Sequence, residues 1–171
     1  MAHEKKKIKI VCLDFDGTLV DSNSIKDNAF ETILFDYPEY KDIMMNYHTN
    51  NNAIDRYQKF FYFVNNILKK KDDKLVIKLV DKFSHITDEL IKNCIFVKGA
   101  KLFLEKIYKK VDIYLLSATP TSNLKKILRY KEIDHYFKET YGAPINKIEI
   151  INKLVDKHKV KHSEILYIGD T

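Results

Sequence analysis

With 171 residues, of which 45% are hydrophobic and 32% charged, the chain is long enough for one globular domain with an insertion, since domains usually run to about 100–150 residues. No apolar run approaches the roughly 20 residues of a membrane span, and no secretory signal is recognisable, so we expect a cytoplasmic protein that binds no membrane. The net charge of +6 comes from lysines spread among acids along every expected helix, which argues against nucleic acid as a partner.

The first element is the stretch from Lys7 to Leu13, which contains an apolar, β-branched run and predicts a buried strand. Asp14 and Asp16 follow it two residues apart, so both carboxylates project to one side of an extended backbone, and Gly17 allows a sharp turn. Two acids this close repel each other unless a cation or a shared proton lies between them. The pair therefore predicts a hard divalent ion such as Mg²⁺.

A calcium-binding loop is the main structural alternative for an Asp-x-Asp-Gly sequence. With Asp14 as position 1 of such a loop, glycine is required at position 6 and glutamate at position 12. Gly17 occupies position 4 and Ile25 position 12, so the sequence argues against a calcium loop.

Residues 22–97 contain no convincing strand and predict a helical insertion. Arg56 and Lys59 are three residues apart and should share a helix face away from the apolar stripe, where we expect them to select an anionic substrate. A solvated basic face is the alternative. Two apolar stripes at helical spacing should pack on each other: Ile54, Tyr57, Phe61, Val64 and Leu68, and then Val76, Leu79, Phe83, Ile86, Leu90 and Cys94.

Strands and helices alternate after the insertion, which predicts a parallel α/β sheet. We expect one core domain from residues 1–21 and 98–171, with residues 22–97 as its insertion. Cys12 and Cys94 lack metal-ligand spacing and are expected to be structural free thiols. The three later strands are expected at Val111–Leu116, Lys138–Tyr141 and Glu164–Ile168.

The segment Asp14-Phe-Asp-Gly-Thr-Leu-Val-Asp-Ser22 resembles the first motif of the haloacid dehalogenase (HAD) superfamily in its phosphatase form. Tyr114-Leu-Leu-Ser117, Lys147 ahead of a helix and Ile168-Gly-Asp170 resemble the second, third and fourth motifs in the family order. The resemblance covers essentially the whole chain. It implies a Rossmann-like parallel α/β core with an inserted α-helical cap, similar to the subclass of phosphoglycolate phosphatase and β-phosphoglucomutase.

The resemblance further implies a hydrolase of small phosphorylated metabolites that depends on Mg²⁺. Asp14 would attack phosphorus to form an aspartyl-phosphate, and Asp16 would act as general acid and then as general base. Lys147 would offset the negative charge on the nucleophile and the phosphate.

The remaining implied roles are in binding. Ser117 and the backbone N–H of Ala118 would hold phosphoryl oxygens, and Mg²⁺ would be bound by Asp14, Asp170 and the carbonyl of Asp16. Each residue also has a structural alternative: Ser117 could cap the following helix, and Asp170 could be an ordinary turn residue. Lys147 could likewise be a surface lysine. The order of these residues, each near the carboxyl end of an expected strand, favours the functional interpretation.

Three functions fit these motifs: a phosphatase, a sugar phosphomutase of the same superfamily, and a C-terminally truncated, weakly active or regulatory remnant. A 2-haloacid dehalogenase fits less well, since those relatives lack the acid two residues after the nucleophile, which is Asp16 here. In the family the chain continues past the fourth motif with a second acidic residue, a strand and a helix, whereas this sequence stops at Thr171.

Overall fold

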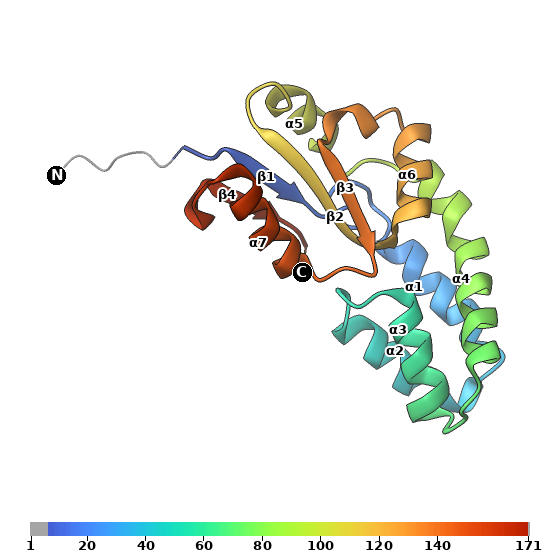
Figure 1. Cartoon of the computed structure of the whole chain (residues 1–171). Helices are drawn as coiled ribbons and strands as arrows, with labels where there is room; N and C mark the ends of the chain where they lie inside the picture. The colour runs from blue at the N-terminus through green and yellow to red at the C-terminus, as the bar shows by residue number, and fades with distance from the viewer. Residues whose placement is uncertain (1–6, 171) are drawn as a thin grey trace. The chain divides into compact units, whose positions relative to one another are not determined.

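The computed structural model describes residues 7–170 (Figure 1). Residues 1–6 and 171, which belong to the expected core domain, lie outside the described part. The chain divides into two compact units, one containing the sheet and one formed by Ser22–Cys94. Within residues 7–170, none of the helices combines the length and the apolar character that a membrane crossing requires.

The boundary that we expected after residue 97 falls after Cys94, because the returning segment pairs with the chain that leaves the sheet unit. The Asp21 amide donates to the Ile95 carbonyl at 3.0 Å, and the Val97 amide donates to the Leu19 carbonyl at 3.0 Å. These two hydrogen bonds place residues 95–97 in the sheet unit.

The sheet unit contains four parallel strands in the order β3-β2-β1-β4, as the alternation of strands and helices predicts. All four residues of the first strand are buried, which explains its continuous apolar sequence in a sheet covered on both faces. The second strand extends four residues beyond its predicted end at Leu116. The strands are β1 (Ile10–Leu13), β2 (Asp112–Pro120), β3 (Glu139–Ala143) and β4 (Ile165–Ile168).

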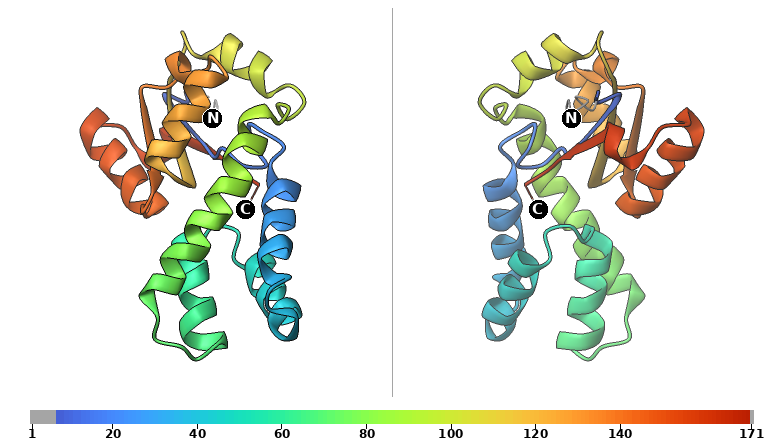
Figure 2. Two further views of the ribbon diagram at one scale, coloured as in Figure 1. Left: turned by 90° about the vertical axis from the view of Figure 1, so that its right-hand side faces the viewer. Right: turned by 90° about the vertical axis from the view of Figure 1, so that its left-hand side faces the viewer.

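Helices cover both faces of this sheet, with α6 and α7 on opposite sides (Figure 2). Ile150 and Leu154 of α7 pack with Cys12 and its neighbours on one face. Burial raises the pKa of the Cys12 thiol to about 12, which fits the expected structural thiol. The helical segments of this unit are α5 (Ala100–Ile107), α6 (Thr121–Tyr130), α7 (Lys147–His158) and the short 3₁₀ turns η3 (Asp134–Tyr136) and η4 (His162–Glu164).

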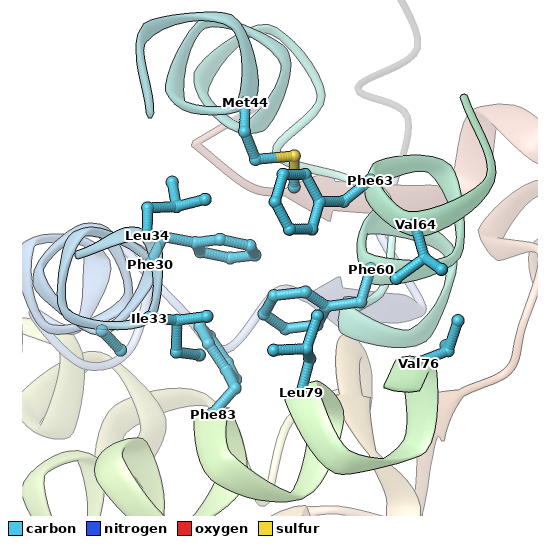
Figure 3. Packing of buried hydrophobic residues seen from close by; sticks show 11 residues of the cluster. Phe30, Ile33, Leu34, Met44, Phe60, Phe63, Val64, Val76, Leu79 and Phe83 are labelled. Carbon is cyan, nitrogen blue, oxygen red and sulfur yellow. The ribbon is translucent and has the colours of Figure 1, made fainter. Parts of the chain in front are cut away.

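The second unit is helical throughout, as expected. Helices α1 and α3 both pack against α4, and three phenylalanine rings meet between them (Figure 3). The ring centre of Phe30 lies 5.0 Å from that of Phe60 and 4.8 Å from that of Phe83, which is the usual range for aromatic pairs. The elements are α1 (Asn23–Leu34), η1 (Pro38–Tyr40), α2 (Lys41–Asn50), α3 (Arg56–Tyr62), the π-helix η2 (Phe63–Ile67) and α4 (Asp73–Asn93).

The prediction of which residues form the buried face of α3 is wrong. Tyr57 and Phe61 are 48% and 43% exposed, whereas Arg56 and Lys59 are only 6% and 4% exposed. The helix instead turns Phe60 inward, and the π-helix that follows breaks the regular spacing on which the prediction relied. A helix face that includes two cations is therefore buried.

The predicted stripe of α4 holds for its first half only. Val76, Leu79 and Phe83 are buried as expected. Toward the C-terminus the buried positions are Thr87 and Ile91, while Leu90 is 52% exposed. The side-chain hydroxyl of Thr87 can be buried because it donates to the Phe83 carbonyl at 2.9 Å.

Candidate active site

The two aspartates of the first motif lie in the loop that leaves β1. Asp14 and Asp16 are 6% and 8% exposed, so both acids are largely removed from water. The loop turns back at Gly17, whose φ of 69° is a conformation that favours glycine. The Gly17 amide donates to the Val20 carbonyl at 2.8 Å and closes the turn.

Asp14 is held by three donors. The Phe15 amide donates to Oδ1 at 2.7 Å, and the Lys147 ammonium donates to Oδ2. The Tyr167 hydroxyl also donates to Oδ2, at 3.2 Å, and accepts a hydrogen bond from Lys147 Nζ at 2.9 Å. One carboxylate oxygen therefore accepts hydrogen bonds from both an ammonium group and a phenol.

The environment of Lys147 favours its charged form. Burial by itself lowers the pKa of this ammonium, but the charge of Asp14 and the hydrogen bonds to Asp14 and Tyr167 outweigh burial and raise it above its ordinary value. Burial also raises the pKa of Tyr167, so its phenol keeps its proton at neutral pH. Lys147 reaches the site because Asn146 caps α7, accepting from the Ile148 amide at 3.0 Å.

The Asp16 carboxylate faces two hydroxyl groups of β2. Thr119 Oγ1 donates to Asp16 Oδ2 at 3.0 Å, and Ser117 Oγ approaches the same oxygen at 3.4 Å. The Thr119 amide in turn donates to Ser117 Oγ at 3.0 Å, so the two hydroxyl groups are linked. Both residues are buried.

A bulge in β2 accompanies this arrangement. Ser117 pairs with Gly142 but Pro120 pairs with the next residue of β3, so two residues of β2 stand outside the regular pairing. A Cβ on Gly142 would lie 2.4 Å from the Thr119 carbonyl oxygen and 2.5 Å from the Thr121 amide nitrogen. Only glycine lets β3 approach the bulge this closely.

The sequence model of the haloacid dehalogenase-like hydrolases matches residues 8–171. The chain belongs to this family. No curated protein matches the sequence of this HAD-like hydrolase. Its fold is, however, shared by solved structures of several bacterial proteins.

A predicted phosphoglycolate phosphatase from Haemophilus somnus has 20% sequence identity and a TM-score of 0.70, with 95% of this chain and 77% of that chain covered. A protein from Thermotoga maritima assigned as a β-phosphoglucomutase has 17% identity and a TM-score of 0.64, covering 96% and 77%. A protein from Bacillus subtilis assigned as a HAD-hydrolase and bound to magnesium has 17% identity and a TM-score of 0.66, covering 97% and 79%. At these identities the likeness establishes the fold.

The structure brings most of the sequence-predicted residues of the HAD-like hydrolase to one edge of the sheet. Asp14 contacts Lys147, and Asp16 contacts Ser117, while Ala118 lies in the bulge of β2. Asp170 follows β4, which pairs directly with β1. The Asp14 amide donates to the carbonyl of Ile168, the last residue of β4, at 2.9 Å.

Sequence reasoning missed two residues of this site, Thr119 and Tyr167. Thr119 is two residues after Ser117, so the strand periodicity that placed Asp14 and Asp16 together could have found it. Tyr167 belongs to an apolar strand run, and nothing in its sequence setting distinguishes it from a core residue.

The oxygen donors at the strand ends suit the magnesium that the family resemblance implies. Two carboxylates, Asp14 and Asp170, end adjacent strands, and the Asp16 carbonyl lies on the same loop as Asp14. Among residues 7–170 no group of three or more His, Cys, Asp or Glu side chains is arranged to hold a metal. The implied ligand set consists of two carboxylate side chains and one backbone carbonyl, which are oxygen donors of the kind that Mg²⁺ prefers.

Arg56 and Lys59 belong to the helical unit, where both have internal partners. Arg56 Nη1 donates to Ser84 Oγ at 2.7 Å, and the guanidinium carbon lies 5.1 Å from the centre of the Phe83 ring. Lys59 Nζ donates to His48 Nδ1 at 2.8 Å and to the His48 carbonyl at 3.1 Å. Their expected role in substrate selection stays a prediction, whereas the alternative of a solvated basic face is wrong, because both side chains are buried.

Proposed function

We propose that this HAD-like hydrolase removes phosphate from small phosphate monoesters through an aspartyl-phosphate on Asp14. One observation carries the proposal: two neighbouring carboxylates have chemically different partners. Asp14 is paired with the Lys147 ammonium, whereas Asp16 accepts from the hydroxyl groups of Ser117 and Thr119. Carboxylates in contrasting environments are typical of sites where one acts as nucleophile and the other as acid and base.

In the first step an Asp14 carboxylate oxygen attacks phosphorus and forms a new O–P bond, while the bond from phosphorus to the ester oxygen breaks. The leaving oxygen takes a proton from Asp16, so an alcohol departs. Lys147 stabilises the ionised nucleophile before attack and the phosphoryl charge during it.

In the second step the aspartyl-phosphate is hydrolysed. Asp16, now a carboxylate, removes a proton from water, whose oxygen attacks phosphorus as the bond to Asp14 breaks. Inorganic phosphate leaves and Asp14 returns to its starting form. Hydroxyl groups can donate to a carboxylate or accept from a carboxylic acid, so Ser117 and Thr119 suit a group that changes its protonation state twice per turnover.

The phosphoryl oxygens would be bound by the Ser117 hydroxyl and the backbone amide of Ala118, which the bulge of β2 removes from regular strand pairing. The Asp14 and Asp170 carboxylates and the Asp16 carbonyl would hold Mg²⁺, which when bound supplies positive charge that neutralises the phosphoryl group.

The test is release of inorganic phosphate from p-nitrophenyl phosphate and from a panel of metabolite monoesters in the presence of Mg²⁺. Asp14→Asn should lower kcat by at least about 10³-fold, as expected for loss of a covalent nucleophile. Asp156→Asn is a matched control, because this exposed aspartate of α7 is remote from β1 in sequence and should keep full activity. An Asp14→Asn variant that turns over at the wild-type rate would contradict the covalent mechanism.

A phosphoenzyme measurement separates the two aspartates. Wild-type protein quenched in acid during turnover should carry phosphate that hydroxylamine removes, as an acyl phosphate requires. Asp16→Asn should slow both the formation and the decay of this species, because the same group serves both steps. Label on a residue other than Asp14 would contradict the proposal.

A further inference from the structure

We propose that Tyr167 is a positioning residue of the phosphatase site: its hydroxyl group holds the Asp14 carboxylate and the Lys147 ammonium in the geometry that the attack on phosphorus requires. This inference rests on the proposed function for its catalytic consequence. The contacts that it invokes all lie within the sheet unit.

The direction of both hydrogen bonds is fixed by chemistry. A lysine ammonium can only donate and an ionised carboxylate can only accept, so the hydroxyl between them must accept from Lys147 and donate to Asp14. The two distances, 2.9 Å to Nζ and 3.2 Å to Oδ2, are both within hydrogen-bonding range. Tyr167 therefore links cation and nucleophile with one polar atom, and phenylalanine could not replace it.

The ring of Tyr167 is fixed independently of its hydroxyl. It packs on the core cluster beneath α7, and Lys147 Nζ lies 5.5 Å from the ring centre, within the range of a cation–π contact. Ring and hydroxyl thus both face the same ammonium. Because Lys147 has a long and flexible side chain, two contacts to one rigid aromatic group restrict where its charge can lie.

Gly169 provides a separate indication that the position of this phenol matters. A Cβ at Gly169 would lie 2.8 Å from both Cε1 and Oη of Tyr167, closer than real side chains approach. The glycine of the fourth motif therefore leaves room for the tyrosine two residues before it. Its backbone is not in the left-handed region, so this space is the feature that alanine would remove.

The consequence for catalysis is geometric. Both donors to Asp14 Oδ2 restrain rotation of the carboxylate, and the Phe15 amide restrains its other oxygen. Small displacements of a nucleophile reduce the rate steeply, since in-line attack requires the reacting atoms to be close and aligned. Loss of the Tyr167 hydroxyl should therefore lower kcat and leave substrate binding nearly unchanged.

The decisive variant is Tyr167→Phe, which removes one oxygen and keeps the ring. We expect kcat to fall by about 10-fold, in the range usual for groups that orient a site, with KM unchanged within about 2-fold. The matched control is Tyr141→Phe, which removes a hydroxyl bonded to Glu139 on the neighbouring strand β3 and should leave kcat unchanged. Unchanged kcat in Tyr167→Phe, or an equal loss in both variants, overturns the proposal.

A double-mutant cycle tests the role of Gly169. Gly169→Ala should lower kcat in the wild-type background by displacing the phenol, and should cost clearly less once Tyr167→Phe has removed the hydroxyl. Equal costs in the two backgrounds would show that Gly169 acts through something other than Tyr167, and would overturn this part of the argument.

Crystal structures provide a readout that does not depend on activity. In Tyr167→Phe, Lys147 Nζ should leave its position on Asp14 Oδ2 or become disordered, whereas Tyr141→Phe should keep it. An unchanged Lys147 overturns the positioning role even if the wild-type protein hydrolyses no phosphate ester. Conversely, a displaced Lys147 in a protein without phosphatase activity would retain the positioning role and reject the proposed function.

Discussion

The buried histidine of the helical unit should make stability fall as the pH drops below neutrality. His48 is 3% exposed and its ring stacks on Phe30, with centres 3.9 Å apart. Lys59 donates to Nδ1, so Nε2 carries the proton and donates to Asp27 Oδ1 at 2.9 Å. Protonating Nδ1 would break the bond to Lys59 and place two positive charges together.

Burial, reinforced by the positive charge of Lys59, lowers the pKa of His48 to about 4. Lys26 acts in the same direction, while Asp27 opposes it. The unfolded chain binds a proton at this histidine below about pH 6.5, but the folded protein does so only near pH 4. The contribution of neutral His48 is therefore fully present above pH 6.5 and is lost as the pH falls through this window.

The magnitude follows from the size of the shift. Each pKa unit corresponds to about 1.4 kcal/mol, so a shift of this size amounts to about 3 kcal/mol over the full window and to about 2 kcal/mol between pH 7 and pH 4.5. Since a domain is typically stable by only about 5–15 kcal/mol, the effect should be measurable.

The assay compares urea unfolding at pH 7 and pH 4.5 for wild type, His48→Gln and His85→Gln. His85 is an exposed histidine of α4 in the same unit and serves as the control. His48→Gln should be less stable at pH 7, but the difference from wild type should shrink by about 2 kcal/mol at pH 4.5. NMR titration of the His48 ring gives its pKa directly. A ring that titrates near 6.5, or a stability difference independent of pH, would refute the reasoning.

Three further outcomes are expected. Thr119→Val should lower kcat by about 10-fold because Asp16 loses a hydroxyl donor, and Thr119→Ser should restore most of the activity; equal rates for Val and Ser would exclude this role. Gly142→Ala should destabilise the protein and reduce activity, because the alanine Cβ would meet backbone atoms that cannot move aside. A melting temperature equal to that of the wild type in thermal denaturation would contradict this expectation. Arg56→Ala should cost about 2 kcal/mol of stability by removing the hydrogen bond to Ser84 and the contact with the Phe83 ring, and the KM for anionic substrates in the same variant tests its predicted role in selectivity.

The sheet and the acidic pair could be predicted because both depend on local pattern. A continuous apolar run ending in Asp14 indicates a buried strand and a loop at its carboxyl end, and parallel strands bring such ends to one edge. The later strands were placed within a few residues of their observed bounds, except that β2 runs on to Pro120. Its bulge depends on Gly142 of another strand and has no signal in the sequence of β2 itself.

The buried face of α3 could not be predicted from periodicity, because its polar members depend on partners from other helices. A pattern argument places Arg56 and Lys59 on the surface, since an unpaired buried charge is costly. Ser84 of α4 and His48 of α2 offset that cost, and neither is near α3 in sequence. Tyr167 was missed for a related reason: the partners of its hydroxyl group are contributed by the loop after β1 and by α7.

The paired hydrogen bonds at the base of the helical unit have a consequence for protein engineering. The chain leaves at Asp21 and returns at Ile95, and the amide of one bonds the carbonyl of the other. For the sheet unit, the insertion is therefore a single loop whose two ends are already joined by hydrogen bonds. The entropic cost of closing a loop grows only slowly with its length, so insertions of very different size should be interchangeable between Asp21 and Ile95. Chimeric proteins that carry the insertion of another protein should therefore be joined at these two residues.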